Sequence, residues 1–324
     1  MERSIRIEPY RNGDEAAILD IWQAALAPDA IDMETFAQKV LADPNYEREG
    51  ILVARDGERP VGFCLVVARR VPIGPESGLD PDDAWISAFA VAPDARRAHV
   101  ASRLFEAAEA FARARGRRRV EVSPYAPNYF WPGVDKERYP EALAFLEGRG
   151  YRPVYECVAM DRNLVGYVTP PDVRALEASL EAEGYHFTTL GPRYVRSVIE
   201  FNDRVFNPDW ARACREAVAR RVPFDRTLIC VKDDAVCGFA QIGAYDQVPD
   251  RFGPFGVDES LRGKGIGKVL LYRSMAALAA KGYHDTWFLW TGERSPAGHL
   301  YRRAGFSVTR HFVIYGRDIQ GGEA

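Results

Sequence analysis

The sequence lacks a long apolar run, a Cys-x-x-Cys pair and a strong net charge, and each absence narrows the possible functions. No apolar stretch reaches the roughly 20 residues of a membrane-spanning helix, and Met1-Glu2-Arg3-Ser4 lacks the apolar region of a signal peptide. The five cysteines are dispersed, which disfavours a zinc site or a disulfide framework. The formal net charge of −3 gives no sign of nucleic-acid binding. We therefore expect a cytoplasmic protein that binds neither membranes nor nucleic acids.

The chain repeats one pattern, and its length of 324 residues is typical of about two domains. Segment 91–101 parallels segment 257–267, and an amphipathic helix is expected after each. Both copies also contain two neighbouring apolar segments typical of a β-hairpin, namely 50–55 with 60–67 and 227–231 with 236–242. We predict two tandem α/β domains with mixed (α+β) sheets, residues 1–165 and 166–324. A helix of the second domain is expected to start at Pro170 or Pro171.

The second copy contains a glycine-rich segment, Arg262-Gly263-Lys264-Gly265-Ile266-Gly267-Lys268, between an expected strand and an expected helix. Glycines at alternate positions let the backbone turn sharply and approach a ligand closely. The start of the following helix offers unpaired N–H groups and a positive dipole end, which together bind phosphate. The spacing differs from that of a P-loop and of the dinucleotide fingerprint. We therefore predict a diphosphate site of another kind.

This segment resembles the Arg/Gln-x-x-Gly-x-Gly/Ala loop of the GNAT superfamily of N-acetyltransferases. Further along, segment 297–306 resembles the Ala-x-x-Leu-Tyr-x-x-x-Gly-Phe motif of the same superfamily. The resemblance implies that the loop binds the diphosphate of acetyl-CoA and that Tyr301 protonates the departing thiolate. It also implies that the strand before the loop holds the pantetheine and polarises the carbonyl. The predicted acetyl-CoA-binding residues are Phe255, Gly256, Val257, Arg262, Gly263, Lys264, Gly265, Ile266, Gly267 and Lys268.

A general base is harder to identify. GNAT enzymes often carry a glutamate on the strand before the loop, but segment 253–256 has none. Asp246 and Asp250 lie just upstream and could accept a proton directly or through water. Aspartates at such positions are more often solvated turn residues.

The first copy differs from the second at positions that matter for the chemistry. His99 stands where the second copy has Gly265, and Leu146 stands where it has Tyr301. The first copy also has an insertion with the aromatic run 129–131, which suits either ligand contact or packing over its own domain. We predict that the C-terminal domain transfers an acyl group, most often acetyl, from CoA to a small-molecule amine. The alternative is a non-catalytic acyl-CoA sensor or interaction protein. The sequence agrees equally with a monomer and with a homodimer.

Overall fold

The computed structural model describes residues 5–75, 77–243, 245 and 248–319, and the chain divides into two compact units. Unit 1 consists of Met1–Pro72, Gly78–Cys157 and His311–Ala324, and unit 2 of Ile73–Ser77 and Val158–Arg310. The boundary expected from the sequence, between residues 165 and 166, falls inside unit 2. Residues 311–319, which the sequence assigns to the second domain, belong to unit 1.

Unit 1 is built on a mixed sheet with the strand order β1-β2-β3-β4-β5-β13, in which β4 and β5 are parallel. The strands are β1 (Ile5–Pro9), β2 (Ile51–Asp56), β3 (Arg59–Ala68), β4 (Asp83–Val91), β5 (Arg119–Val122) and β13 (Ser307–Asp318). The expected hairpin is confirmed, because β2 and β3 pair antiparallel. The second half of β13 pairs with β5, so the C-terminal segment completes the sheet of unit 1.

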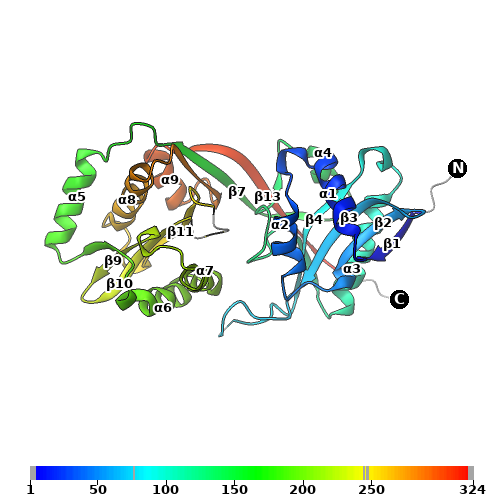
Figure 1. Ribbon diagram of the computed structural model, residues 1–324, viewed down its shortest axis with the longest axis horizontal. Coiled ribbons are helices and arrows are strands. Elements are labelled where there is room, and N and C mark those ends of the chain that lie inside the picture. The colour runs from blue at the N-terminus through cyan, green and yellow to red at the C-terminus, as the bar shows by residue number, and fades with distance from the viewer. Residues whose placement is uncertain (1–4, 76, 244, 246–247, 320–324) are drawn as a thin grey trace. The chain divides into compact units, whose positions relative to one another are not determined.

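Helices of unit 1 pack on this sheet (Figure 1). Helices α1 (Asp14–Ala25) and α3 (Val100–Ala114) contact its strands, whereas α2 (Met33–Phe36) lies against α1 and α4 (Pro140–Gly148) lies against a short strand, β6 (Val134–Asp135), that pairs with β13. Trp22 of α1 is buried and its ring stacks on Phe63 of β3, with 5.2 Å between ring centroids. Phe130 and Trp131 lie 4.9 Å and 5.8 Å from the same indole ring. The aromatic insertion therefore packs over its own unit.

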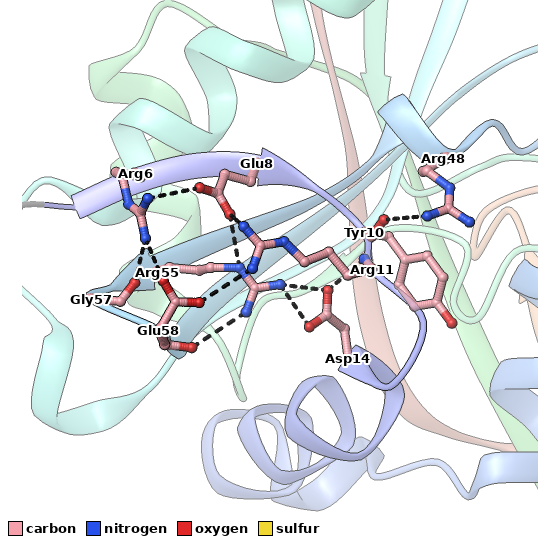
Figure 2. Close-up of polar contacts among 9 residues, drawn as sticks. All are labelled: Arg6, Glu8, Tyr10, Arg11, Asp14, Arg48, Arg55, Gly57 and Glu58. Carbon is pink, nitrogen blue, oxygen red and sulfur yellow. Dashed lines mark hydrogen bonds and ion pairs between the residues drawn. The ribbon is translucent and has the colours of Figure 1, made fainter.

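A network of arginine and carboxylate side chains joins β1, β2 and the start of α1 (Figure 2). The Arg55 side chain is only 4% exposed. Its Nη2 donates to both carboxylate oxygens of Asp14 at 2.7 Å, and its Nε donates to Glu8 at 3.1 Å. Because the guanidinium is buried, removing Asp14 would leave its charge compensated by Glu8 alone and would destabilise the fold by up to about 3–5 kcal/mol.

Unit 2 contains an antiparallel sheet with the order β11-β10-β9-β8, and a second antiparallel pair, β7 with β12, in which β7 is also the neighbour of β13. The strands are β7 (Arg152–Asn163, its second half in unit 2), β8 (His186–Thr189), β9 (Thr227–Lys232), β10 (Ala235–Ile242), β11 (Phe252–Val257) and β12 (Asp285–Thr291). The second expected hairpin is confirmed as β9 and β10. Almost every residue of these two strands is buried, which explains their continuous apolar sequence.

The helices of unit 2 are α5 (Pro171–Ala182), α6 (Val195–Val205), α7 (Pro208–Ala219), α8 (Ile266–Ala280) and α9 (Pro296–Arg303). Helix α5 begins at Pro171, one of the two starts expected from the sequence. Helix α8 buries Leu271, Met275 and Leu278 in the core of this unit, as their spacing of three to four residues predicts. In the described part of the chain, no helix is both long enough and apolar enough to span a membrane.

Candidate active site

One edge of β11 has almost no strand partner. Its other edge pairs with β10, whereas its pairing with β12 in the described part of the chain is a single parallel bridge, Arg251 with Trp287. Residues 255–257 are accordingly only partly buried. Backbone N–H and C=O groups along such an edge can bind an extended ligand as they would bind a strand. Pro254 lies within β11, where proline is tolerated because this edge does not continue the sheet.

The glycine-rich segment turns twice through the left-handed region before α8 begins. Gly263 has φ +83° and Gly265 has φ +91°, a region that glycine adopts far more readily than other residues. Gly265 is the N-cap of α8, and no side chain caps the helix there. The first N–H groups of α8 therefore have no side-chain acceptor and are suited to an anion.

Three cations surround this turn, and each has a carboxylate partner. Lys268 lies 2.7 Å from Asp172 of α5, and Lys264 lies 3.8 Å from Glu183 just after α5. Arg262 pairs with Glu259 three residues before it. Because these pairs are exposed, they contribute little to stability and can exchange a carboxylate for a phosphate at small cost.

Tyr301 of α9 lies among aromatic rings from both β11 and β12. Its ring centroid is 4.4 Å from that of Phe288 and 6.1 Å from those of Phe252 and Phe255. The side chain is only 7% exposed, and no hydrogen-bond partner of its hydroxyl is found among the described residues. Burial raises the pKa of Tyr301 above its ordinary value, so the hydroxyl keeps its proton at neutral pH. A protonated hydroxyl is what a general acid needs.

The two candidate bases predicted from the sequence are Asp246 and Asp250. Asp246 lies outside the described residues. Asp250 precedes β11, and its backbone oxygen accepts a hydrogen bond of 2.8 Å from Thr286. Burial first, and then the charge of Asp250, raise the pKa of Asp285. Asp250 thus faces another acid at the start of β12, and its role as a base stays a prediction.

Unit 1 keeps the shape of the turn without its glycines. Arg97 has φ +62° and His99 has φ +55°, and His99 is the N-cap of α3 as Gly265 is of α8. The helix that corresponds to α9 is α4, in which Leu146 is buried. A leucine side chain can neither donate nor accept a proton, so unit 1 has no counterpart of the Tyr301 hydroxyl.

Sequence reasoning missed two features around this site. Helix α5 was expected, but not its packing beside the turn, where Leu176 lies against Gly265. The contacts of Phe252, Phe255 and Phe288 with Tyr301 were also missed, although each of these phenylalanines lies in or next to a segment that the sequence predicts to be a strand. Neither contact leaves a local signal, because each joins segments that are distant in the sequence.

Comparison with known proteins places both repeats in one family. Residues 16–130 match the profile described as acetyltransferase (GNAT) family, and residues 223–308 match the one described as acetyltransferase (GNAT) domain. This chain belongs to the GNAT family. It is a tandem GNAT acetyltransferase, with two copies of the domain as the sequence predicts.

Two curated relatives are both named mycothiol acetyltransferase. The protein from Actinosynnema mirum is 29% identical over 245 residues, which cover 73% of this chain and 76% of that protein. The protein from Beutenbergia cavernae is 27% identical over 198 residues, which cover 58% of this chain and 66% of that protein.

Solved structures share the fold of this GNAT chain. A GCN5-related N-acetyltransferase from Sphaerobacter thermophilus has a TM-score of 0.70 at 19% identity, covering 98% of this chain and 97% of that one. A tandem GNAT protein from the clavulanic acid biosynthesis pathway has a TM-score of 0.63 at 17% identity, covering 99% and 100%. A fungal multi-domain β-N-acetylglucosaminidase has a glucosamine N-acetyltransferase region with a TM-score of 0.81 at 18% identity. This chain is 98% covered by that match but spans only 38% of the fungal chain.

Proposed function

We propose that the C-terminal GNAT copy transfers an acetyl group from acetyl-CoA to a small-molecule amine. The observation that carries the proposal is the Tyr301 side chain: burial raises the pKa of its hydroxyl, that hydroxyl has no protein hydrogen-bond partner among the described residues, and its ring centroid lies 6.1 Å from that of Phe255 on β11. The glycine turn that follows β11 supports a diphosphate site in the same unit. The leucine at the corresponding position of unit 1 supports catalysis by unit 2 alone.

The chemistry needs a bound thioester, a stabilised oxyanion and two proton transfers. Backbone N–H groups on the free edge of β11, from Phe255 to Val257, would hold the pantetheine and polarise the carbonyl. The nitrogen of the amine forms a bond to the carbonyl carbon, and the carbon–sulfur bond breaks. Tyr301 donates its proton to the sulfur that leaves. The proton that the amine loses passes to Asp250, directly or through water, in this proposal.

The acceptor is proposed from the relatives rather than from the site. Two relatives carry the name mycothiol acetyltransferase; one matches 73% of this chain and the other matches 58%. An amine related to mycothiol is therefore the first acceptor to test. All five cysteines are free thiols, which supports a reducing cytoplasm as the place of the reaction.

The test is release of free CoA, followed with a thiol reagent, from acetyl-CoA and a panel of small amines. We expect one class of amine to release CoA with the wild-type protein and much less with Tyr301→Phe. Tight binding of acetyl-CoA without transfer to any amine, peptide amines included, would contradict an enzymatic role for this site.

A further inference from the structure

Two cysteines face each other across the β9–β10 hairpin of unit 2. Val236 pairs with Val231 and Gly238 pairs with Cys230, so Cys237 is the extra residue of a β-bulge opposite Cys230. Both side chains belong to one core cluster, and the Cys237 thiol donates to the backbone oxygen of Cys230 across 3.3 Å.

This arrangement is compatible with a disulfide bond. Directly opposed residues of an antiparallel pair have Cα atoms about 4.5–5.5 Å apart, and Cys237 is the immediate chain neighbour of Gly238, the residue directly opposed to Cys230. Disulfide-bonded cysteines have Cα atoms about 4.4–6.8 Å apart. A bond between Cys230 and Cys237 is therefore within reach, and closing it shifts the backbone of the bulge, because Cys237 is one residue out of register with Cys230.

Unit 1 has the same bulge without sulfur. There Gly62 pairs with Ala54, and Val61 is the extra residue opposite Ala54. The fold can thus fill these two positions with valine and alanine. The cysteines of unit 2 are therefore not required by the bulge, and unit 1 supplies the matched replacement for each of them.

The bulge is connected directly to the diphosphate turn. The backbone oxygen of Cys237 accepts a hydrogen bond of 3.0 Å from the N–H of Asp258, the residue that follows β11 and begins the turn. In unit 1 the oxygen of Val61 accepts the corresponding bond from Ala92 at 2.9 Å. A change in the backbone at Cys237 consequently moves an anchor of the turn.

We propose that Cys230 and Cys237 form a site of reversible oxidation, at which a disulfide bond weakens the diphosphate turn. The oxidant is a peroxide, with hydrogen peroxide as the simplest case. The Cys237 thiolate attacks one peroxide oxygen, the O–O bond breaks, and hydroxide leaves to give a sulfenic acid. The Cys230 sulfur then attacks the Cys237 sulfur and water leaves. In total, two thiols lose two electrons and two protons, and one peroxide becomes two waters.

Cys237 is the residue that reacts first. It is 7% exposed, whereas Cys230 is completely buried. The neighbouring Cys230 side chain lowers the pKa of Cys237, while burial raises the pKa of Cys157 and Cys214 to about 12. A lower pKa means more thiolate, and the thiolate is the reactive form.

The disulfide can be detected by peptide mapping of the full-length protein. Trypsin cleaves after Arg226, Lys232 and Arg251, so Cys230 and Cys237 fall in the separate peptides 227–232 and 233–251. After treatment of the reduced protein with hydrogen peroxide and alkylation of the remaining thiols, we expect these two peptides to be linked. Dithiothreitol should separate them. Absence of the linked pair, at peroxide doses that oxidise an added small thiol completely, would overturn the proposal.

The effect on the turn is measured by acetyl-CoA titration, and this part rests on the proposed function. We expect the affinity of the oxidised wild-type protein to be at least tenfold lower than that of the reduced protein. The double variant Cys230→Ala, Cys237→Val copies unit 1 and should bind equally before and after peroxide; Cys230→Ala alone serves if the double variant folds poorly. Linked peptides without any change in affinity would overturn the coupling to the turn. If the reduced protein does not bind acetyl-CoA, the proposed function fails, and the linked peptides still decide whether the disulfide forms.

Discussion

Leu176 of α5 occupies the space beside Gly265 that a side chain there would need. A Cβ atom at Gly265 would lie only 2.7 Å from Cδ2 of Leu176. Helix α5 thus packs against the diphosphate turn itself, and Asp172 and Glu183 hold the two lysines of the turn from the same side. Two features therefore favour glycine at position 265: its left-handed backbone conformation and the close contact with Leu176.

The first prediction concerns the change Gly265→His, which introduces the residue that unit 1 has at His99. We expect acetyl-CoA binding to weaken at least tenfold, about 1.4 kcal/mol, because the φ of +91° and the space beside Leu176 both oppose a side chain. Calorimetry measures the affinity. In the double variant Gly265→His, Leu176→Ala the steric conflict is removed, and binding should stay weak. Full recovery of acetyl-CoA affinity in the double variant would mean that the single change acts by displacing α5. Unchanged affinity in the folded single variant would mean that the turn is not part of the cofactor site.

The second prediction separates the two units. His99→Gly should leave turnover as in the wild type, because Leu146 still stands where a proton donor is needed. Gly265→His should abolish turnover at ordinary acetyl-CoA concentrations. Steady-state rates of both variants give the comparison. If Gly265→His keeps full activity while changes around Arg96 abolish it, the roles of the two units are the reverse of those proposed.

The third prediction is that Tyr301→Phe lowers turnover by roughly two orders of magnitude, as expected for loss of a general acid. Acetyl-CoA affinity should hardly change, because the ring keeps its aromatic contacts. Since burial raises the pKa of Tyr301, the wild-type rate should not fall between about pH 8 and pH 10 through ionisation of this group. Tyr167→Phe is the control, because its hydroxyl donates instead to the backbone oxygen of Tyr272 in the same unit. Equal rates for Tyr301→Phe and the wild type would move the acid to another group.

The fourth prediction is that Asp172→Asn strengthens acetyl-CoA binding by about two- to fivefold at low salt, the range expected for exposed ion pairs. The change frees Lys268 for a phosphate and removes a negative charge beside the turn. The gain should shrink as salt is added. Glu200→Gln, which breaks an exposed pair with Arg196 on α6, should have no effect. Weaker binding in Asp172→Asn would mean that the carboxylate helps to shape the site.

The fifth prediction concerns stability and pH. The pKa of Asp285 is raised in the folded protein, by burial first and then by Asp250. The folded state therefore favours the protonated form, and this contribution is present below the unfolded pKa and lost as the pH rises through the folded pKa. Asp285→Asn cannot ionise, so it should raise the Tm at pH 7 and have much less effect near pH 3.5. Asp225→Asn, which removes a carboxylate paired with Lys281, should not raise the Tm. A Tm for Asp285→Asn that is unchanged at pH 7 would contradict the interaction.

Local features of the fold were predictable because their causes are local. Proline at position 171 sets the start of α5, and glycine at position 265 permits the turn before α8. The spacing of apolar residues in α8 predicts which face is buried. In each case the residues that decide the structure lie within a few positions of one another.

Other features depend on partners far along the chain. The run 129–131 suits a ligand site as well as a core, and only its contact with Trp22 decides for the core of unit 1. The sequence shows that His99 replaces a glycine, but it does not show that His99 adopts a left-handed conformation similar to that of Gly265. The sequence identifies which side chain is present, while tertiary packing determines whether the backbone tolerates it.

The pairing of β13 with β5 has a consequence for biosynthesis. Tyr315, Gly316, Arg317 and Asp318 lie opposite residues 119–122, which leave the ribosome much earlier. Until β13 has been made, β5 waits as an exposed strand edge, the kind of edge at which chains aggregate. Unit 1 is therefore the first unit to begin synthesis and the last to be completed. A messenger truncated just after the codon for Phe306 would encode every active-site motif, but the sheet of unit 1 would lack its strand β13.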